Sequence, residues 1–408
     1  MTEDLTDGPL VRPLRSDEFR AASTLFRASL HHVAATDEAW AVRGRSYEEG
    51  RVLGAFRGDT LVGSALSMGS QLAVPGGALL PMAMVTAVGV RADQTRRGVL
   101  TSLMRAQLTG ITEPVATLRA SEAVIYGRFG YGVASRGRML TVDRRRAVVR
   151  PEVPQAGSVR LVPFADAQEV LPGLYDAVSV QRPGWAARPD GWWSEVRMWS
   201  VESKELTWAA IHSGPDGDDG FAIYNVTRTR DAEPKSVLNL EELWGATGEV
   251  WASLWRFLLT VDLVDEIRAN YRPLDEQVER LFVDRRLVRT TWLEDETWLR
   301  LADVPAALAA RSFGELATGA GSVVIEVRDR FLPANSGRYL IGDGPARSVD
   351  ETAELTLDVD TLAELYLGDV APSQLASVGR ITVAKAEALE RADRLFAVAG
   401  SPWCGTFF

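Results

Sequence analysis

The sequence predicts a mixed α/β protein built from three consecutive segments, and three observations support this. Apolar strand-like runs alternate with helical patterns. The order strand, turn, helix occurs twice, at Val85 to Leu108 and at Val237 to Leu259. The chain has 408 residues, more than one compact core usually holds. With a joint at the proline- and glycine-containing stretch Pro151 to Ser158, the expected domains are residues 1–150, 159–296 and 297–408.

Composition and charge exclude several classes of protein. Hydrophobic residues make up 46% and charged residues 25%, as in ordinary globular proteins, and the net charge of -10 argues against a nucleic-acid partner. No apolar run approaches the ~20 residues of a membrane span, and the acidic N-terminus has no signal-peptide pattern. We therefore expect a cytoplasmic protein without membrane association. With only Cys404 and three histidines, we expect no metal centre.

The first segment is predicted to form a strand-rich unit with one helix. The stretch "LGAFRGDTLVGSALSMGSQLAVPGGALLPMAMVTAVGV" indicates successive strands with turns at Gly58-Asp59 and Gly76-Gly77. A helix begins near Gly98, "TEPVATLRAS" indicates a further strand, and the glycine-rich "YGRFGYG" follows.

The later segments continue the alternation. A strand at Val237 to Leu243 and a helix at Gly248 to Leu259 indicate a degenerate internal copy of the first segment. The third segment begins near Thr297 and carries short strands around Val323 to Val327 and Leu355 to Val359. It ends in an amphipathic helix near Lys385 to Phe396. The tail "GSPWCGTFF" is unusually aromatic and uncharged for an exposed terminus, which suggests that it is anchored by burial.

The turn "TRRGVL" joins the buried strand that ends at Val90 to the following helix. A helix N-terminus presents unpaired N–H groups and partial positive charge, so an adjacent turn with Arg96 and Arg97 is suited to an anion. Gly98 lets phosphate oxygens approach the backbone, and the helix has an apolar face for the sheet at Val99, Leu100, Leu103 and Leu108. Pyrophosphate binding is one interpretation, and a well-solvated basic helix start is the other.

This turn resembles motif A of the GCN5-related N-acetyltransferases (GNAT), in which it holds the pyrophosphate of acetyl-coenzyme A, although Thr95 and Leu100 depart from the motif. The stretch "ASEAVIYGRFGYG" closely resembles the Eis (enhanced intracellular survival) acetyltransferases. Further similarity lies in "VPGGALLP", "LTVDRR", "RLVRTTWLEDETWLRLADVPAALAAR" and "LYLG". The resemblance implies two tandem GNAT-type domains, the second degenerate, followed by a domain like sterol carrier protein.

The resemblance also implies which residues bind acetyl-coenzyme A. The backbone of the motif A strand receives the pantetheine arm and the thioester, the turn receives the pyrophosphate, and the next strand adds two contacts. The residues at the matching positions are Val88, Gly89, Val90, Arg96, Arg97, Gly98, Val99, Leu100, Thr101, Ser121 and Glu122. The second strand-turn-helix has Glu249 and no arginine in its turn, so we expect no coenzyme A there.

Two catalytic groups follow from the resemblance. Acyl transfer to an amine requires a proton acceptor for the nucleophile and a proton donor for the leaving thiolate. Tyr126 matches the family's proton donor, and the terminal carboxylate, here on Phe408, matches its proton acceptor. From the residues alone, Tyr126 and Tyr131 could equally be packing residues, and the aromatic tail could serve stability only.

The acceptor pocket is expected to include His32, Trp40 and Trp192. His32 stands where the best-known relatives carry an aspartate, which disfavours a strongly polycationic acceptor. Trp192 and Trp193 could reach the pocket from the second segment or pack in its core. The physiological acceptor is left open.

The sequence thus predicts an enzyme that transfers acetyl from acetyl-coenzyme A to amines of a small molecule. Aminoglycosides are the leading substrate class, and the amine is expected to attack directly in a ternary complex. The resemblance further implies a hexamer. Two alternatives remain: a non-enzymatic lipid- or small-molecule-binding protein using the sterol-carrier-like domain, and an acyltransferase for protein lysines or longer acyl groups.

Overall fold

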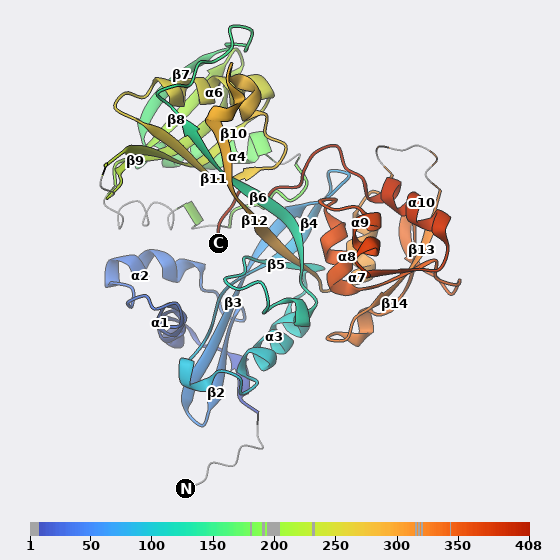
Figure 1. Cartoon of the computed structure of the whole chain (residues 1–408). Helices are drawn as coiled ribbons and strands as arrows, with labels where there is room; N and C mark the ends of the chain where they lie inside the picture. The colour runs from blue at the N-terminus through green and yellow to red at the C-terminus, as the bar shows by residue number, and fades with distance from the viewer. Residues whose placement is uncertain are drawn as a thin grey trace.

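The computed structural model of the chain describes residues 8–179, 182–189, 192–193, 205–230, 233–314, 316, 319, 321–342 and 344–408. Residues 1–7 of the predicted first domain lie outside this range. The described residues form two β-sheets with helices packed on them (Figure 1). The mixed α/β class predicted from the sequence is confirmed.

The larger sheet contains twelve of the described strands, in the order β1-β2-β3-β4-β5-β12-β6-β11-β10-β9-β8-β7. The strands on the first half are β1 (Leu10–Pro13), β2 (Val52–Arg57), β3 (Thr60–Ala73), β4 (Leu79–Val90), β5 (Val115–Leu118) and β6 (Gly132–Asp143). Those of the second half are β7 (Ser158–Pro163), β8 (Thr207–Gly214), β9 (Gly217–Arg228), β10 (Ser236–Gly245), β11 (Glu266–Pro273) and β12 (Val288–Leu301).

Strand β12 joins the halves into one continuous sheet. It pairs antiparallel with β5 on one side and with β6 on the other, and β6 pairs in turn with β11. In Figure 1, β6 and β12 run from the lower unit into the upper one. Thr297, where we place the start of the third domain, lies inside β12. The domain limits 1–150, 159–296 and 297–408 stay predictions.

Among the described helices, α1 (Phe19–Ser29) and α3 (Val99–Gly110) pack on the first half of the sheet, and α2 (Asp37–Arg43) follows α1 in the chain. As predicted from the apolar spacing, α3 buries Val99, Leu103 and Leu108, and Leu100 is half-buried. Helix α1 packs on β4 at Gly89, where a Cβ would come within 2.9 Å of the Phe26 Cα atom. A glycine there brings this helix close to the strand predicted to receive the thioester.

The second half repeats the arrangement of the first. Strand β10 leads into α6 (Gly248–Thr260), and α4 (Leu171–Ser179) packs against β9 and β10. The strand-turn-helix predicted at Val237 to Leu259 is confirmed. Strand β10 pairs parallel with β11, as β4 pairs parallel with β5. This pairing supports the interpretation of an internal copy.

The third segment forms the smaller sheet, with described strands in the order β15-β14-β13-β16-β17. They are β13 (Val323–Arg328), β14 (Gly337–Gly342), β15 (Gly344–Ser348), β16 (Leu355–Asp358) and β17 (Ile381–Val383). The helices are α7 (Val304–Ala310), α8 (Val359–Tyr366), α9 (Pro372–Ser377) and α10 (Ala386–Phe396). The strands and the amphipathic helix predicted for this segment are confirmed.

The glycine-rich "YGRFGYG" packs the first segment against the third. Gly130 adopts φ 85°, and a Cβ there would lie 2.5 Å from Arg300 Nη1. At Gly132 a Cβ would lie 2.1 Å from the carbonyl oxygen of Asp360 in α8. The motif therefore needs glycine for close approach between the two units.

The aromatic tail is anchored by burial, as predicted. Trp403 is 2% exposed, its ring centroid lies 4.2 Å from that of Trp244, and Thr406 is fully buried. In Figure 1 the dark red tail runs away from the third unit, and its end lies where the units meet.

Replacing Gly132 by alanine should lower stability by about 1–3 kcal/mol, because the added methyl group overlaps backbone that cannot move freely. Gly127→Ala is the matched control, since nothing lies within 4 Å of a Cβ there, and it should change stability by less than about 0.5 kcal/mol. Urea unfolding of both variants measures the difference. Equal unfolding midpoints for the two variants would contradict the packing role of the motif.

Candidate active site

The site forms where two parallel strands part. Strands β4 and β5 pair only over Met82–Met84 and Val115–Thr117, and β4 then continues to Val90 while β5 ends at Leu118. The edge of β4 beyond Met84 therefore has no strand partner on the β5 side among the described residues. Its backbone N–H and C=O groups on that edge need other partners, and an amide-containing arm can supply them.

A bulge in β4 shapes this edge. The pairing register with β3 shifts between Ser64 and Leu66, opposite Thr86 to Gly89. Ala87 at this place adopts φ 49°, a left-handed conformation that is costly for a residue with a side chain. Bulges re-aim backbone groups beside active sites, and this one turns the strand at the predicted Val88 to Val90 contacts.

A cavity of about 780 Å³ opens beside the parted strands, a volume typical of small-molecule sites. It brings together six of the residues predicted from the sequence: His32, Val88, Ser121, Tyr126, Trp192 and Phe408. They come from the first segment, the second segment and the tail.

Tyr126 precedes a short 3-10 turn, Gly127–Phe129, and is 7% exposed. Its ring meets that of Tyr131 edge-on at a centroid separation of 5.8 Å. Burial raises the pKa of the Tyr126 phenol to about 12. The phenol therefore stays protonated at neutral pH and can act as a hydrogen-bond or proton donor inside the cavity.

Phe408, at the end of the tail, lines the same cavity. Trp192 Nε1 donates to the carbonyl oxygen of Phe407 at 3.0 Å, and Arg119 Nη2 donates to that of Thr406 at 2.8 Å. The buried hydroxyl of Thr406 contacts Tyr175 Oη at 3.0 Å. The residues before the terminus are thus fixed by their main chain and by one side chain. Trp192, which we predicted as either pocket wall or core, lines the cavity and holds the tail.

Two acidic residues of β12 line the cavity, and our sequence reasoning did not find them. They are Glu294 and Asp295, which lie beyond the end of β5 and so face the cavity edge of β12. Glu294 Oε2 is buried without a hydrogen-bond partner among the described residues. The stretch "LEDETW" could have pointed to these residues, because three consecutive acidic residues are unusual inside a strand.

Basic residues also line the cavity. Arg27 from α1 and Arg43 from α2 line it together with the exposed His32. Trp40 is not among the lining residues in the described part of the chain. Its ring packs edge-on against Tyr47, which does line the cavity, at a centroid separation of 5.3 Å. The cavity is therefore lined by carboxylates of β12 and the tail and by arginines of α1, α2 and the end of β5, Arg119 among them.

The arginine turn lies on the surface at the start of α3. Arg96, Arg97, Gly98 and Thr101 are exposed, whereas Val99 is buried. Arg96 (φ 61°) and Gly98 (φ 80°) are left-handed and turn the chain sharply into the helix. Among the described residues, no side chain caps this helix N-terminus. Its first N–H groups and two cationic side chains are therefore available to an anion. Ser121 and Glu122 are also exposed, beyond the end of β5.

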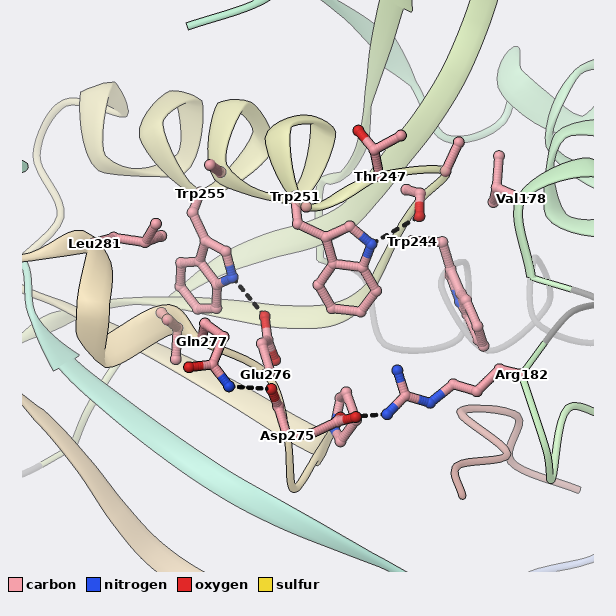
Figure 2. Close-up of a pocket in the computed structure, with 16 residues that line it drawn as sticks. Val178, Arg182, Trp244, Thr247, Trp251, Trp255, Asp275, Glu276, Gln277 and Leu281 are labelled. Carbon is pink, nitrogen blue, oxygen red and sulfur yellow. Dashed lines mark hydrogen bonds and ion pairs between the residues drawn. The ribbon is translucent and has the colours of Figure 1, made fainter. Parts of the chain in front are cut away.

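The second strand-turn-helix has its own smaller cavity, of about 410 Å³, with Trp244, Trp251 and Trp255 among its walls (Figure 2). Here Arg272 inserts between the parted strands, because its Nη2 donates to the carbonyl oxygen of Leu243 in β10 at 3.1 Å. Glu276 pairs with Arg272 and accepts from Trp255 Nε1 at 2.6 Å. Part of the edge that is open in the first half is thus occupied in the second by the protein's own side chains.

In the described part of the chain, no group of three or more His, Cys, Asp or Glu residues is placed to hold a metal ion. None of the described helices is long and apolar enough to cross a membrane.

Comparison with protein families agrees with this architecture. Models of an acetyltransferase (GNAT) domain match residues 10–134 and again residues 184–301, and a model of the sterol carrier protein domain matches residues 304–405. The parted strands and the following helix therefore belong to a GCN5-related N-acetyltransferase, an enzyme class that uses acetyl-coenzyme A and acts on amines.

Similar proteins and a solved structure identify the family within this enzyme class. The N-acetyltransferase Eis of Mycobacterium bovis is 37% identical over 364 residues, 84% of this chain and 85% of that protein. An uncharacterized N-acetyltransferase of Streptomyces avermitilis is 37% identical over 96% of this chain and 98% of that protein. The crystal structure of Eis1 from Mycobacterium abscessus superimposes with a TM-score of 0.88 at 35% identity, covering 98% of this chain and 100% of that chain. The chain belongs to the Eis family of N-acetyltransferases.

Proposed function

We propose that the enzyme acetylates an amine of a small polyamine-like molecule, aminoglycosides being the leading class, by direct attack in a ternary complex. The observation that carries the proposal is that Tyr126, the terminal residue Phe408 and the open edge of β4 border one cavity. Acetyl-coenzyme A would enter along that edge, and the amine would enter from the side of the tail and β12.

The arginine turn supports a path for the donor. Arg96, Arg97 and the uncapped N-terminus of α3 would hold the pyrophosphate, with Gly98, Leu100 and Thr101 in the same turn. The backbone of Val88, Gly89 and Val90 would take the pantetheine amides and the thioester carbonyl. Ser121 and Glu122 would contact the arm from the end of β5.

Direct attack of the amine on the thioester is proposed because the chain's one cysteine is unsuited to form a covalent acetyl-enzyme. Cys404 is 1% exposed, and burial raises the pKa of its thiol. A nucleophilic cysteine needs an accessible, stabilised thiolate, and Cys404 has neither feature. The amine is therefore expected to attack the thioester itself.

The two catalytic groups have separate tasks. The charge of the Phe408 carboxylate would attract the acceptor's ammonium group. The carboxylate would take a proton from it, directly or through water, so that the neutral amine can attack the thioester. Tyr126 would donate to the leaving thiolate. A thiol of ordinary pKa ~8.5 is a stronger acid than a phenol of pKa about 12, so full transfer to a solvated thiolate would be uphill. Burial in the same cavity would also raise the pKa of the leaving thiol, so the proposed geometry favours a hydrogen bond from the phenol that becomes a proton transfer as the C–S bond breaks. Water would then return a proton to the phenolate.

The acceptor's further amines would bind towards β12. Glu294 and Asp295 carry negative charge there, whereas Arg27 and Arg43, from α1 and α2, disfavour a cation close to them. His32 and Trp192 would border the acceptor, and Trp40 would support Tyr47 from behind. This polarity suits an acceptor with two or more ammonium groups, although His32 brings no charge comparable to an aspartate.

We further propose, from the family resemblance, a cytoplasmic hexamer in which the second GNAT-type unit binds no coenzyme A. Arg272 occupies its strand gap, and Glu249 is exposed at the start of α6. The roles of this unit would be scaffold and cavity wall.

The test of the proposed function is coenzyme A release from acetyl-coenzyme A, followed with a thiol reagent, across aminoglycosides, polyamines and lysine-containing peptides. We expect turnover with polyamine-like small molecules. Turnover with peptides alone would move the substrate class to proteins. Absence of turnover together with lipid retained on native mass spectrometry would favour a carrier.

The double variant Arg96→Ala, Arg97→Ala should raise the Kd for acetyl-coenzyme A by about 10- to 100-fold, because charge-assisted phosphate contacts are lost. Calorimetry measures this Kd, and the wild type should bind one molecule of acetyl-coenzyme A per chain. Arg145→Ala, Arg146→Ala is the matched control, another adjacent pair of exposed arginines. A similar loss in both double variants would indicate only a charge effect of the whole chain.

Tyr126→Phe should lower kcat by about 100-fold while the Kd for acetyl-coenzyme A changes less than twofold. Tyr131→Phe is the control, since its buried hydroxyl has no partner among the described residues. The phenol is the donor only while protonated, that is, below its pKa of about 12. The wild-type rate should therefore show no loss from phenol ionisation between pH 8 and 10. Full kcat in Tyr126→Phe would remove the donor role.

Glu294→Gln should raise the KM of a diamine by about tenfold and that of a matched monoamine much less, because only the diamine presents a second ammonium to β12. Steady-state kinetics with both acceptors measures the ratio. An equal change for both acceptors would contradict the proposed orientation.

A further inference from the structure

We infer that Glu296 and Arg119 form a clamp that positions the terminal carboxylate in the cavity. The inference rests on the proposed function only for what the carboxylate does there. The contacts that hold the tail are visible without it. Both residues act through the tail, so they are positioning residues.

Glu296 is the centre of the clamp. Its side chain is fully buried in β12. The N–H of Cys404 donates to Oε2 at 3.0 Å, and the N–H of Gly405 donates to Oε1 at 2.8 Å. One carboxylate therefore binds two consecutive main-chain amides of the tail, which fixes the direction in which the chain leaves this point.

Arg119 extends the clamp by one residue. Its Nη2 donates to Glu296 Oε1 at 3.1 Å, and Nε and Nη2 donate to the carbonyl oxygen of Thr406 at 3.0 and 2.8 Å. The guanidinium also lies over the ring of Phe407, 5.2 Å from its centroid. Through these contacts, the end of β5 and the middle of β12 together hold residues 404–407.

The chemistry of Glu296 explains why a carboxylate is needed. Its fourth partner is the Ser135 hydroxyl, which donates to Oε2 at 2.9 Å, so all four hydrogen-bond partners described here are donors. A carboxylate accepts all four bonds, whereas an amide would turn an NH₂ group towards two donors. A buried charge is costly unless it is paired and hydrogen-bonded, and the neighbouring Arg119 pairs it.

A separate pair of residues holds the tail earlier, and Trp192 Nε1 donates to the carbonyl oxygen of Phe407 beyond the clamp. Arg182 Nη2 donates to the carbonyl oxygen of Ser401 at 2.8 Å, and the N–H of Ser401 donates to Asp275 Oδ2 at 3.0 Å. Figure 2 shows this arginine–aspartate pair at the rim of the second cavity. It lies several residues before the terminus and leaves the path of residues 404–408 unspecified.

The experiment is a double-mutant cycle between Glu296→Gln and a variant with one glycine added after Phe408. Glu296→Gln alone should lower kcat about tenfold or more, with the KM for acetyl-coenzyme A changed less than twofold. On the extended chain, whose carboxylate is already displaced, the same substitution should have almost no further effect. An equal loss on both backgrounds would overturn the clamp, because Glu296 would then act independently of the carboxylate.

A replacement variant and a control variant complete the experiment. If Glu296→Gln does not fold, Arg119→Lys replaces it in the cycle, since it keeps the charge and loses the paired donation to Thr406; an additive result overturns the inference equally. Glu113→Gln is the matched control, a buried glutamate paired with Arg51 at 2.7 Å and away from the tail. It should leave kcat unchanged.

A readout that needs no turnover separates this inference from the proposed function. Carboxypeptidase A should release the terminal phenylalanines several-fold faster from Glu296→Gln than from the wild type or Glu113→Gln, as intact-mass analysis would show. Equal release rates would overturn the clamp. If the wild type acetylates no amine, the proposed function fails, and the release rates alone decide the clamp.

Discussion

The parting of β4 from β5 after Met84 is the constraint on which the rest of the site depends. Two parallel strands that separate leave main-chain groups without strand partners, and those groups must be satisfied by something else. In the first half of the large sheet that edge borders a cavity. In the second half, Arg272 and Glu276 fill the corresponding gap. One topology thus gives a large open cavity in one copy and, in the other, a smaller cavity whose strand gap is partly filled by side chains.

Because of strand β12, the candidate active site depends on all three segments of the chain. It inserts between β5 and β6, so its acids lie beside the cavity of the first unit. The third segment packs on the glycine motif that follows Tyr126, and the tail returns from it to the cavity. The two copies and the third segment are therefore needed together to place Tyr126 and Phe408 in one cavity.

Much of this could be predicted from the sequence, because it depends on local signals. Strand and helix periodicity located β4, α3, β10 and α6, and the aromatic tail indicated its own burial. What could not be predicted depends on contacts between distant segments. Glu294 and Glu296 are functional candidates only because β5 ends beside them, and the role of Gly132 depends on α8. Without these pairings, "LEDETW" is an acidic stretch with no assigned neighbour. Trp40 was expected in the cavity wall, but its neighbour Tyr47 lies there.

The most direct test of the account is a crystal structure of the enzyme with coenzyme A and an amine acceptor. The account predicts the pantetheine arm along β4 between Val85 and Val90, its sulfur beside Tyr126, and the Phe408 carboxylate facing the amine. Coenzyme A bound instead in the tryptophan-lined cavity of the second half, or a tail that leaves the first cavity when the acceptor binds, would contradict it.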